Sequence, residues 1–213
     1  MAQSGGMTDV DGTVLVVDDD PSVRNSLQDL LEAVGLQVSL FGSVSEFLAS
    51  SRPEGPLCLV LDIRLPGRGG LDLQEQLARN GDDLPIVFIT GHGDIPMSVK
   101  AMKAGAVEFL PKPFREQDLL DAIHLGLERD RRRRREREIE AEVRRRFESL
   151  TPREKEVLSF VAAGLPNKVI AHEMQLSEIT VKMHRGQVMR KMIARSVPDL
   201  VRMADRLGLA AQR

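Results

Sequence analysis

The chain has 213 residues, of which 42% are hydrophobic and 29% are charged, and its formal net charge is −2. This length is enough to bury one or two hydrophobic cores, which excludes a peptide or a small disulfide-stapled protein. No apolar run approaches the roughly 18 residues of a membrane-spanning helix, the N-terminus lacks the pattern of a secretion signal, and a single cysteine cannot form an internal disulfide. We therefore expect a cytoplasmic protein without membrane contact, in which Cys58 is a small buried hydrophobe.

Charge is distributed unevenly along the sequence. Residues 1–127 carry 9 Lys and Arg against 19 Asp and Glu, a balance of −10, whereas residues 128–213 carry 21 against 13, a balance of +8. An acidic half joined to a basic half suggests different partners, and the basic half is a candidate for binding a polyanion. Seven Phe and no Trp or Tyr provide few platforms for stacking single-stranded bases, which favours duplex DNA.

Short apolar runs alternate with amphipathic stretches over residues 13–127, after a segment 1–12 that we expect to be a disordered leader. The strand-length runs are 14–17, 36–41, 57–61, 85–90 and 108–110, and the helix candidates between and after them are 21–34, 44–51, 71–80, 95–104 and 116–127. This alternation predicts an α/β domain with a doubly wound five-stranded parallel sheet. In such a sheet, ligands lie beyond the carboxyl ends of the strands.

A highly charged segment, residues 128–148, follows this domain. Opposite charges recur four residues apart in it, as in Asp130–Arg134 and Glu140–Arg144, and such pairs stabilise an exposed helix. We favour an exposed helical linker that continues the helix 116–127. A paired coiled coil, for which the segment lacks an apolar seam up to Ile139, and a flexible linker are the alternatives.

Residues 149–213 have an all-helical pattern, which predicts a four-helix domain. Thr151 followed by Pro152 and Glu154 is a helix start, and Ser177 is the expected cap of a helix over 178–193. The other helices are expected at 166–174 and 198–207. Two helices joined by the short turn 175–177, the second of them basic, form a helix-turn-helix. Its basic residues are Lys182, Arg185, Arg190 and Lys191.

Acidic, hydroxyl and amino side chains follow the predicted strands. Asp18 and Asp19 end the first strand, Asp62 the third and Thr90 the fourth, and Lys112 lies just beyond the fifth. Carboxylates gathered at one sheet edge repel one another unless a cation neutralises them, and oxygen ligands select a hard ion such as Mg²⁺ or Mn²⁺. Asp62 is then a candidate nucleophile toward a phosphate donor, with Lys112 and Thr90 donating to the phosphoryl oxygens.

These motifs carry a resemblance that covers residues 13 to 207. The strings VLVVDDD, LDIRLPGRGG, IVFITGHGD, MKAGAVEFLPKPF and, later, LTPREKEVLSFVAAGLPNKVIAHEMQLSEITVKMHRGQVMRKM are similar to those of two-component response regulators of the FixJ/NarL class. That family joins a flavodoxin-like receiver domain to a LuxR-type helix-turn-helix domain. The resemblance implies a receiver over 13–127, the linker over 128–148 and a DNA-binding domain over 149–213.

The resemblance also implies roles for the residues at the strand ends. Asp62 corresponds to the phosphoacceptor, loaded by a sensor histidine kinase, while Asp18, Asp19 and the backbone carbonyl of Arg64 would hold the metal ion. Thr90 and Lys112, with a cis Lys112–Pro113 bond, correspond to signalling residues, and Phe109 to the switch aromatic. We expect phosphorylation to produce a homodimer through the face of the fourth helix and fifth strand. The candidate surface residues there are Ile95, Met97, Val99 and Lys103.

The helix 178–193 is expected to enter the major groove. Lys182, Met183 and Gly186 share the face that the family turns to the bases, where Lys182 can bond guanine and Met183 can pack on a thymine methyl group. A glycine inside a helix costs roughly 1 kcal/mol relative to alanine, so Gly186 either permits close approach to DNA or is a defect. Residues better placed for phosphates are Thr180, Arg185, Arg190, Asn167 and Lys168.

The sequence thus predicts a phosphorylation-switched transcription regulator, an activator that works with RNA polymerase. We expect no enzymatic activity beyond its own aspartyl phosphorylation and dephosphorylation. Asp18 and Asp20 also fit the first-strand motif of haloacid-dehalogenase-type phosphatases, which makes an enzyme the main alternative. An RNA-binding antiterminator output and a protein-interaction bundle at the C-terminus are the others.

Overall fold

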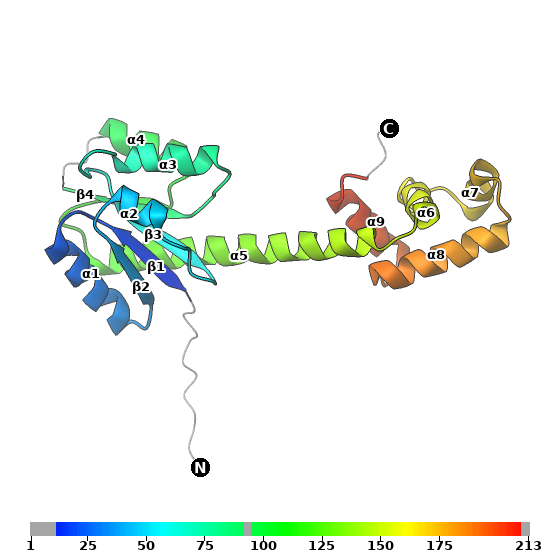
Figure 1. Cartoon of the computed structure of the whole chain (residues 1–213), viewed down its shortest axis with the longest axis horizontal. Helices are drawn as coiled ribbons and strands as arrows, with labels where there is room; N and C mark the ends of the chain where they lie inside the picture. Colours follow the sequence, from blue (N-terminus) through cyan, green and yellow to red (C-terminus); the bar gives the residue numbers. More distant parts are fainter. Residues whose placement is uncertain (1–11, 92–94, 210–213) are drawn as a thin grey trace, which may run out of the picture. The chain divides into compact units, whose positions relative to one another are not determined.

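The structure is a computed structural model that describes residues 12–91 and 95–209, so the predicted leader lies, apart from Gly12, outside the described residues (Figure 1). The chain separates into two compact units, Met1–Arg134 and Arg135–Arg213. Each unit has its own hydrophobic core. The domain boundaries drawn from the sequence stay predictions.

A five-stranded parallel sheet forms the centre of the first unit. Its strands lie in the order β2-β1-β3-β4-β5, which confirms the predicted doubly wound fold. In register, Val17 lies opposite both Phe41 and Leu61, and Thr90 lies opposite Pro111, so that the carboxyl ends of the strands share one edge. The strands are β1 (Thr13–Val17), β2 (Gln37–Phe41), β3 (Leu57–Asp62), β4 (Ile86–Thr90) and β5 (Glu108–Pro111).

Helices cover both faces of this sheet (Figure 1). Side chains alternate along each strand, so Leu59 packs with the α2, α3 and α4 side while Val60 packs with the α1 and α5 side. Cys58 also faces α1 and α5, is fully buried as predicted, and has its pKa raised to about 12 by burial and by the charge of Asp130. The helices are α1 (Pro21–Ala33), α2 (Val44–Ala49), α3 (Gly70–Arg79), α4 (Ile95–Lys103) and α5 (Glu116–Glu148).

Helix α5 continues without a break through the charged segment 128–148, and Asp130 bonds it to the first residue of β3. This carboxylate is fully buried, not exposed as its place in a charge ladder suggested, and it accepts a hydrogen bond from the backbone N–H of Leu57 at 2.9 Å. Arg134 bonds it at 2.6 Å, and Arg133 bonds both Asp130 and the backbone oxygen of Asp83. Among the described residues, no helix is both long and apolar enough to cross a membrane.

Four helices and the end of α5 form the second unit. Thr151 and Glu154 make the predicted capping box, and Ser177 accepts a hydrogen bond from the N–H of Thr180 as the cap of α8. Between α7 and α8 the chain turns through Gln175 in the left-handed region. Val143 of α5 joins the core of this unit. The helices are α6 (Pro152–Ala162), α7 (Asn167–Met174), α8 (Glu178–Met192) and α9 (Val197–Arg206).

Candidate functional site

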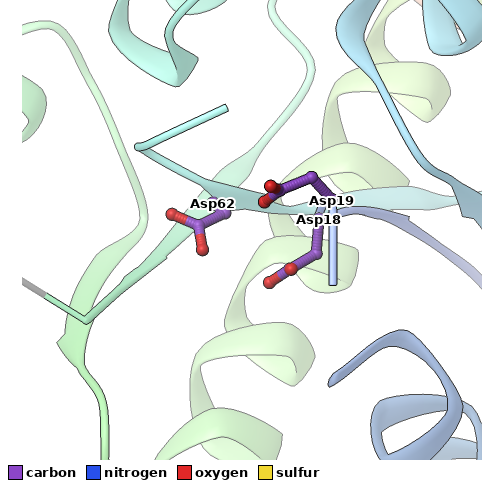
Figure 2. A group of neighbouring side chains, drawn as sticks. All are labelled: Asp18, Asp19 and Asp62. Carbon is purple, nitrogen blue, oxygen red and sulfur yellow. The ribbon is translucent and has the colours of Figure 1, made fainter. Parts of the chain in front are cut away.

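Three carboxylates gather at the carboxyl edge of the sheet (Figure 2). Asp18 and Asp19 follow β1 directly and Asp62 is the last residue of β3, so the parallel register brings them together. One oxygen of each carboxylate lies within 4.8 Å of the others. Asp18 and Asp62 are buried, with 1% and 7% of their surface exposed, whereas Asp19 is exposed. The sequence predicted this cluster by strand ends alone.

Backbone and arginine contacts hold the loop that carries the first two carboxylates. Asp18 Oδ1 accepts a hydrogen bond from the N–H of Asp20 at 2.9 Å, and Asp20 in turn caps α1 by accepting from the N–H of Ser22 at 2.8 Å. Arg24 of α1 donates to the backbone oxygen of Asp18 at 2.7 Å. The sequence analysis did not identify Arg24 as part of this site. Its place in the first turn of α1, directly after the acidic residues, could have indicated this contact.

Lys112 joins the two buried carboxylates. Its Nζ lies 2.7 Å from Asp18 Oδ2 and 2.8 Å from Asp62 Oδ2, and the Lys112–Pro113 bond is cis, as expected. Burial raises the pKa of Asp18, and the hydrogen bonds from Lys112 and from the Asp20 N–H only partly oppose that rise. Burial lowers the pKa of Lys112, but its hydrogen bonds to Asp18 and Asp62 outweigh burial, so the pKa is raised. The single positive charge of Lys112 therefore neutralises the three carboxylates only in part.

The chemistry of this pocket fits a divalent cation. All three candidate ligands are carboxylate oxygens, which hard ions such as Mg²⁺ prefer, and the pocket is short of positive charge. The backbone N–H of Arg64 donates to Asp62 Oδ1 at 2.8 Å, which fixes that carboxylate. The role of the Arg64 carbonyl as a further ligand stays a prediction.

Thr90 and Phe109 lie on the two neighbouring strands. Thr90 ends β4 and is fully buried, at the same edge as Asp62. Phe109 of β5 is half-buried and packs against the core on the α2–α4 side. Its role as a switch stays a prediction.

Gly70, which sequence reasoning missed, lies directly behind the acidic pocket. A Cβ atom at Gly70 would come within 2.6 Å of the backbone oxygen of Asp62 and 3.0 Å of Ile63 Cα. The N–H of Gly70 also donates to the backbone oxygen of Ile63 at 2.9 Å. The start of α3 therefore packs against the end of β3 as closely as a glycine allows. The pair Gly69–Gly70 before a helix was the signal for this approach.

Helix α4 presents apolar side chains to solvent. Ile95 is 80% exposed and Val99 is 44% exposed, and Lys103 is also exposed. Met97, which sequence analysis grouped with them, is half-buried and packs against the core instead. Three of the four predicted surface positions thus face outward.

The predicted base-reading residues of α8 lie on an exposed face of that helix. Lys182, Met183 and Gly186 are all exposed, together with Ile179 one turn earlier. The opposite face of α8, with Val188 at 0% exposure, packs into the core. This face is open for a ligand.

The residues predicted to contact phosphates divide into two groups. Lys168 is exposed, and Arg190 is exposed and bonds Gln187 on its own helix. The others brace the helix-turn-helix internally. Arg185 bonds Asn167 of α7, and the Thr180 hydroxyl lies 2.8 Å from Ser177 Oγ.

Lys191 differs from the other basic residues of α8. Its Nζ lies 2.7 Å from Glu154 Oε2, and Glu154 is buried, so Lys191 ties α8 to α6. Its charge therefore serves the fold of this unit.

Two family models match the chain in sequence. That of the response regulator receiver domain matches residues 14–124, and that of the bacterial regulatory proteins of the luxR family matches residues 148–204. Together they account for both structural units.

Relatives resemble the chain over nearly its whole length. Nodulation protein W of Bradyrhizobium diazoefficiens is 54% identical over 209 residues, which cover 97% of this chain and 92% of that protein. The transcriptional regulatory protein FixJ of Rhizobium meliloti is 43% identical over 194 residues, covering 91% of this chain and 95% of FixJ. A low-resolution structure of the response regulator StyR is 53% identical and superposes with a TM-score of 0.83, covering 92% of this chain and 98% of StyR.

Proposed function

The chain belongs to the response regulators that join a receiver domain to a LuxR-type DNA-binding domain, and on this premise we propose that phosphorylation of Asp62 by a sensor histidine kinase switches its binding to duplex DNA. The observation that carries the proposal is the bridge from Lys112 to Asp18 and Asp62, at 2.7 and 2.8 Å, within the cluster of three carboxylates. It supports the proposal because a carboxylate that can act as a nucleophile, the ammonium group of Lys112 and oxygens suited to binding a metal ion lie close together.

Phosphoryl transfer begins with attack by an Asp62 oxygen on the phosphorus of the kinase phosphohistidine. The phosphorus–nitrogen bond breaks, the imidazole leaves, and an acyl phosphate remains on Asp62. Lys112 moves its hydrogen bond from the carboxylate to the phosphoryl oxygens, and Thr90 donates its hydroxyl to another of them. Phe109 then fills the space that Thr90 leaves.

In this proposal Mg²⁺ or Mn²⁺ would be held by Asp18, Asp19, Asp62 and the carbonyl of Arg64, where it would supply positive charge beside the phosphoryl group. The deficit of positive charge in the pocket supports this assignment, because three carboxylates face one ammonium group.

The signal passes to the surface of α4 and β5, where it favours a homodimer. The exposure of Ile95 and Val99 supports this, since apolar side chains of this size gain by being covered. Two copies place two α8 helices on a two-fold DNA site. There Lys182, Met183 and Gly186 face the bases, and Thr180, Arg185, Arg190, Asn167 and Lys168 face the phosphate backbone. We assign activation of transcription, through RNA polymerase, to the DNA-bound dimer in the cytoplasm.

Mass spectrometry after incubation with acetyl phosphate and Mg²⁺ tests the first step. We expect one phosphoryl adduct on the wild-type chain and none on Asp62→Asn, which keeps the size of the side chain. An adduct that persists in the variant contradicts the assignment of Asp62.

Gel-shift titration tests the second step. The probe is a duplex selected by the phosphorylated protein from a random-sequence pool. Phosphorylation should tighten binding some 5- to 150-fold, as a typical coupling of about 1–3 kcal/mol does. Lys182→Ala should weaken binding without unfolding the protein. Equal affinity with and without phosphorylation refutes the switch.

A further inference from the structure

We propose that α8 recognises thymine methyl groups in its DNA site through apolar contact, made by Ile179 and Met183 beside an open backbone at Gly186, so that Ile179 is a determinant of sequence specificity. The inference rests on the proposed DNA-binding function and adds the chemistry of base recognition to it. Ile179 lies outside the set of groove residues that the sequence pointed to.

The exposure of Ile179 and Met183 has no explanation within the unit itself. Ile179 is 83% exposed and Met183 56% exposed, and residues four apart lie on the same side of a helix. The inner face of α8 supplies the core with Val181, Val188 and Met192, each at 0% exposure. The helix therefore does not need apolar residues on its outer face, and these two side chains form an apolar stripe there.

Gly186 extends this stripe by another turn. A Cβ atom at Gly186 would meet nothing within 4 Å, whereas a Cβ at Gly70 would meet backbone at 2.6 Å. Internal packing thus gives no reason for a glycine, which is less favourable than alanine inside a helix. An approaching surface that needs the helix backbone within reach supplies a reason outside the unit.

Charge identifies the occupant of this stripe as DNA. Lys182 lies on the stripe, Arg190 is exposed farther along α8, and Lys168 is exposed on α7, whereas Glu178 is the single acid on α8. A second copy of this chain would bring the same positive charges against one another, but a duplex brings phosphates. On the stripe, Lys182 can donate a hydrogen bond to a base, whereas Ile179 and Met183 can read bases only through apolar contact.

Thymine is the base that suits such a surface. In the major groove its C5-methyl group is the one apolar feature by which side chains tell it from the other bases. Burying one methyl group is worth about 0.8 kcal/mol, which corresponds to about a fourfold change in affinity. Two such contacts would change affinity by more than tenfold.

The test compares thymine with deoxyuridine, which lacks the methyl group and keeps the same hydrogen-bonding edge. Full-length phosphorylated protein selects duplexes from a random-sequence pool, and the selected duplex is then made with deoxyuridine at each thymine position in turn. We expect about a fourfold loss of affinity at one or two positions in each half-site. In Ile179→Ala the loss should disappear at one of these positions, while the others keep theirs.

Matched variants separate base reading from effects on folding. Ile139→Ala removes another exposed isoleucine, on α5, and should leave the thymine preference unchanged. Gly186→Ala should hold or raise the unfolding temperature and yet weaken DNA binding. Equal affinity of wild-type protein for thymine and deoxyuridine duplexes overturns the inference while DNA binding itself stands. Failure to select any duplex overturns the proposed function together with it.

Discussion

Replacement of Gly70 by alanine tests whether the close packing behind the acidic pocket sets the position of Asp62. The new Cβ would lie 2.6 Å from the Asp62 backbone oxygen, 3.0 Å from Ile63 Cα and 3.2 Å from Leu61 Cγ. Two of these neighbours are backbone atoms of a buried strand end, which cannot turn aside as a side chain does. The strand end or the start of α3 must therefore move.

The magnitude follows from this geometry. Overpacking a buried site costs typically 1–3 kcal/mol, and a contact with backbone belongs at the upper end. Alanine has a higher helix propensity than glycine, which stabilises the folded state by up to about 1 kcal/mol. We expect a net loss of about 2 kcal/mol, which lowers the unfolding temperature of a domain of this size by about 8 °C. Displacement of Asp62 should also slow phosphorylation by acetyl phosphate.

Gly69 provides a matched control one residue away. A Cβ there would meet its nearest neighbours, Asp72 Oδ2 and the Ile63 oxygen, at 3.5 Å, which is ordinary contact. Gly69→Ala should therefore be phosphorylated like the wild-type protein, and it should lose no more than about 1 kcal/mol of stability, since Gly69 is the N-cap of α3. Thermal unfolding and phosphorylation time courses on the full chain measure both variants. If Gly70→Ala matches Gly69→Ala in both, the close approach does not constrain the pocket.

Three further predictions concern other sites. Burial raises the pKa of Asp18, so ionisation of this carboxyl group destabilises the folded state. This destabilisation is absent below the ordinary pKa near 3.8, grows as the pH rises toward the raised pKa, and is complete above it. With a chelator present, Asp18→Asn should therefore be more stable to urea than the wild-type protein at pH 7.5, and this difference should vanish toward pH 3.5. Added Mg²⁺ should stabilise the wild-type protein and not the variant. Asp130→Ala should cost about 1.5–3 kcal/mol in urea unfolding, because it leaves the N–H of Leu57 without its charged acceptor and removes a carboxylate from Arg133 and Arg134. Glu128→Ala on the same helix removes an exposed ion pair and should cost under about 0.5 kcal/mol. Ile193 is β-branched at a φ of 57°, so Ile193→Gly should raise the stability of the second unit by about 1 kcal/mol, and an unchanged unfolding temperature would contradict this reasoning.

The acidic pocket could be predicted from the sequence because strand ends determine it. Parallel strands that end with Asp18, Asp62 and Thr90 must bring these side chains to one edge, whatever the details of the loops. The helix caps were equally predictable, since Thr151 and Ser177 each accept a hydrogen bond from a backbone N–H three residues away. Both kinds of inference need only local geometry.

Contacts between residues far apart in sequence could not be predicted in this way. The bond from Leu57 to Asp130 spans 73 residues, and the pair of Lys191 with Glu154 spans 37. In the sequence, Asp130 and Lys191 look like the exposed charged residues around them. The periodicity of a helix shows which face a residue occupies, but it does not show what covers that face. Gly70 could not be predicted for the same reason, since a glycine is needed there because the backbone at the end of β3 lies so close.

The burial of Asp130 also limits how a signal can leave the receiver. Movement of α5 away from β3 would separate Asp130 from the Leu57 N–H, and movement of α5 toward the sheet is opposed by the close approach at Gly126, where a Cβ would already lie 2.5 Å from Cys58 Sγ. A hydrogen bond from a backbone N–H to a buried carboxylate contributes about 1.5–3 kcal/mol, as much as the roughly 1–3 kcal/mol of a typical allosteric coupling. Helix α4 is held to α3 by weaker contacts: Gln74 donates a neutral amide hydrogen bond to the backbone oxygen of Ala101 at 3.2 Å, and Lys100 pairs with Glu75 near the surface, while Ile95 and Val99 face solvent. Phosphorylation of Asp62 is thus expected to change the α4–β5 surface while the receiver end of α5 stays fixed to β3.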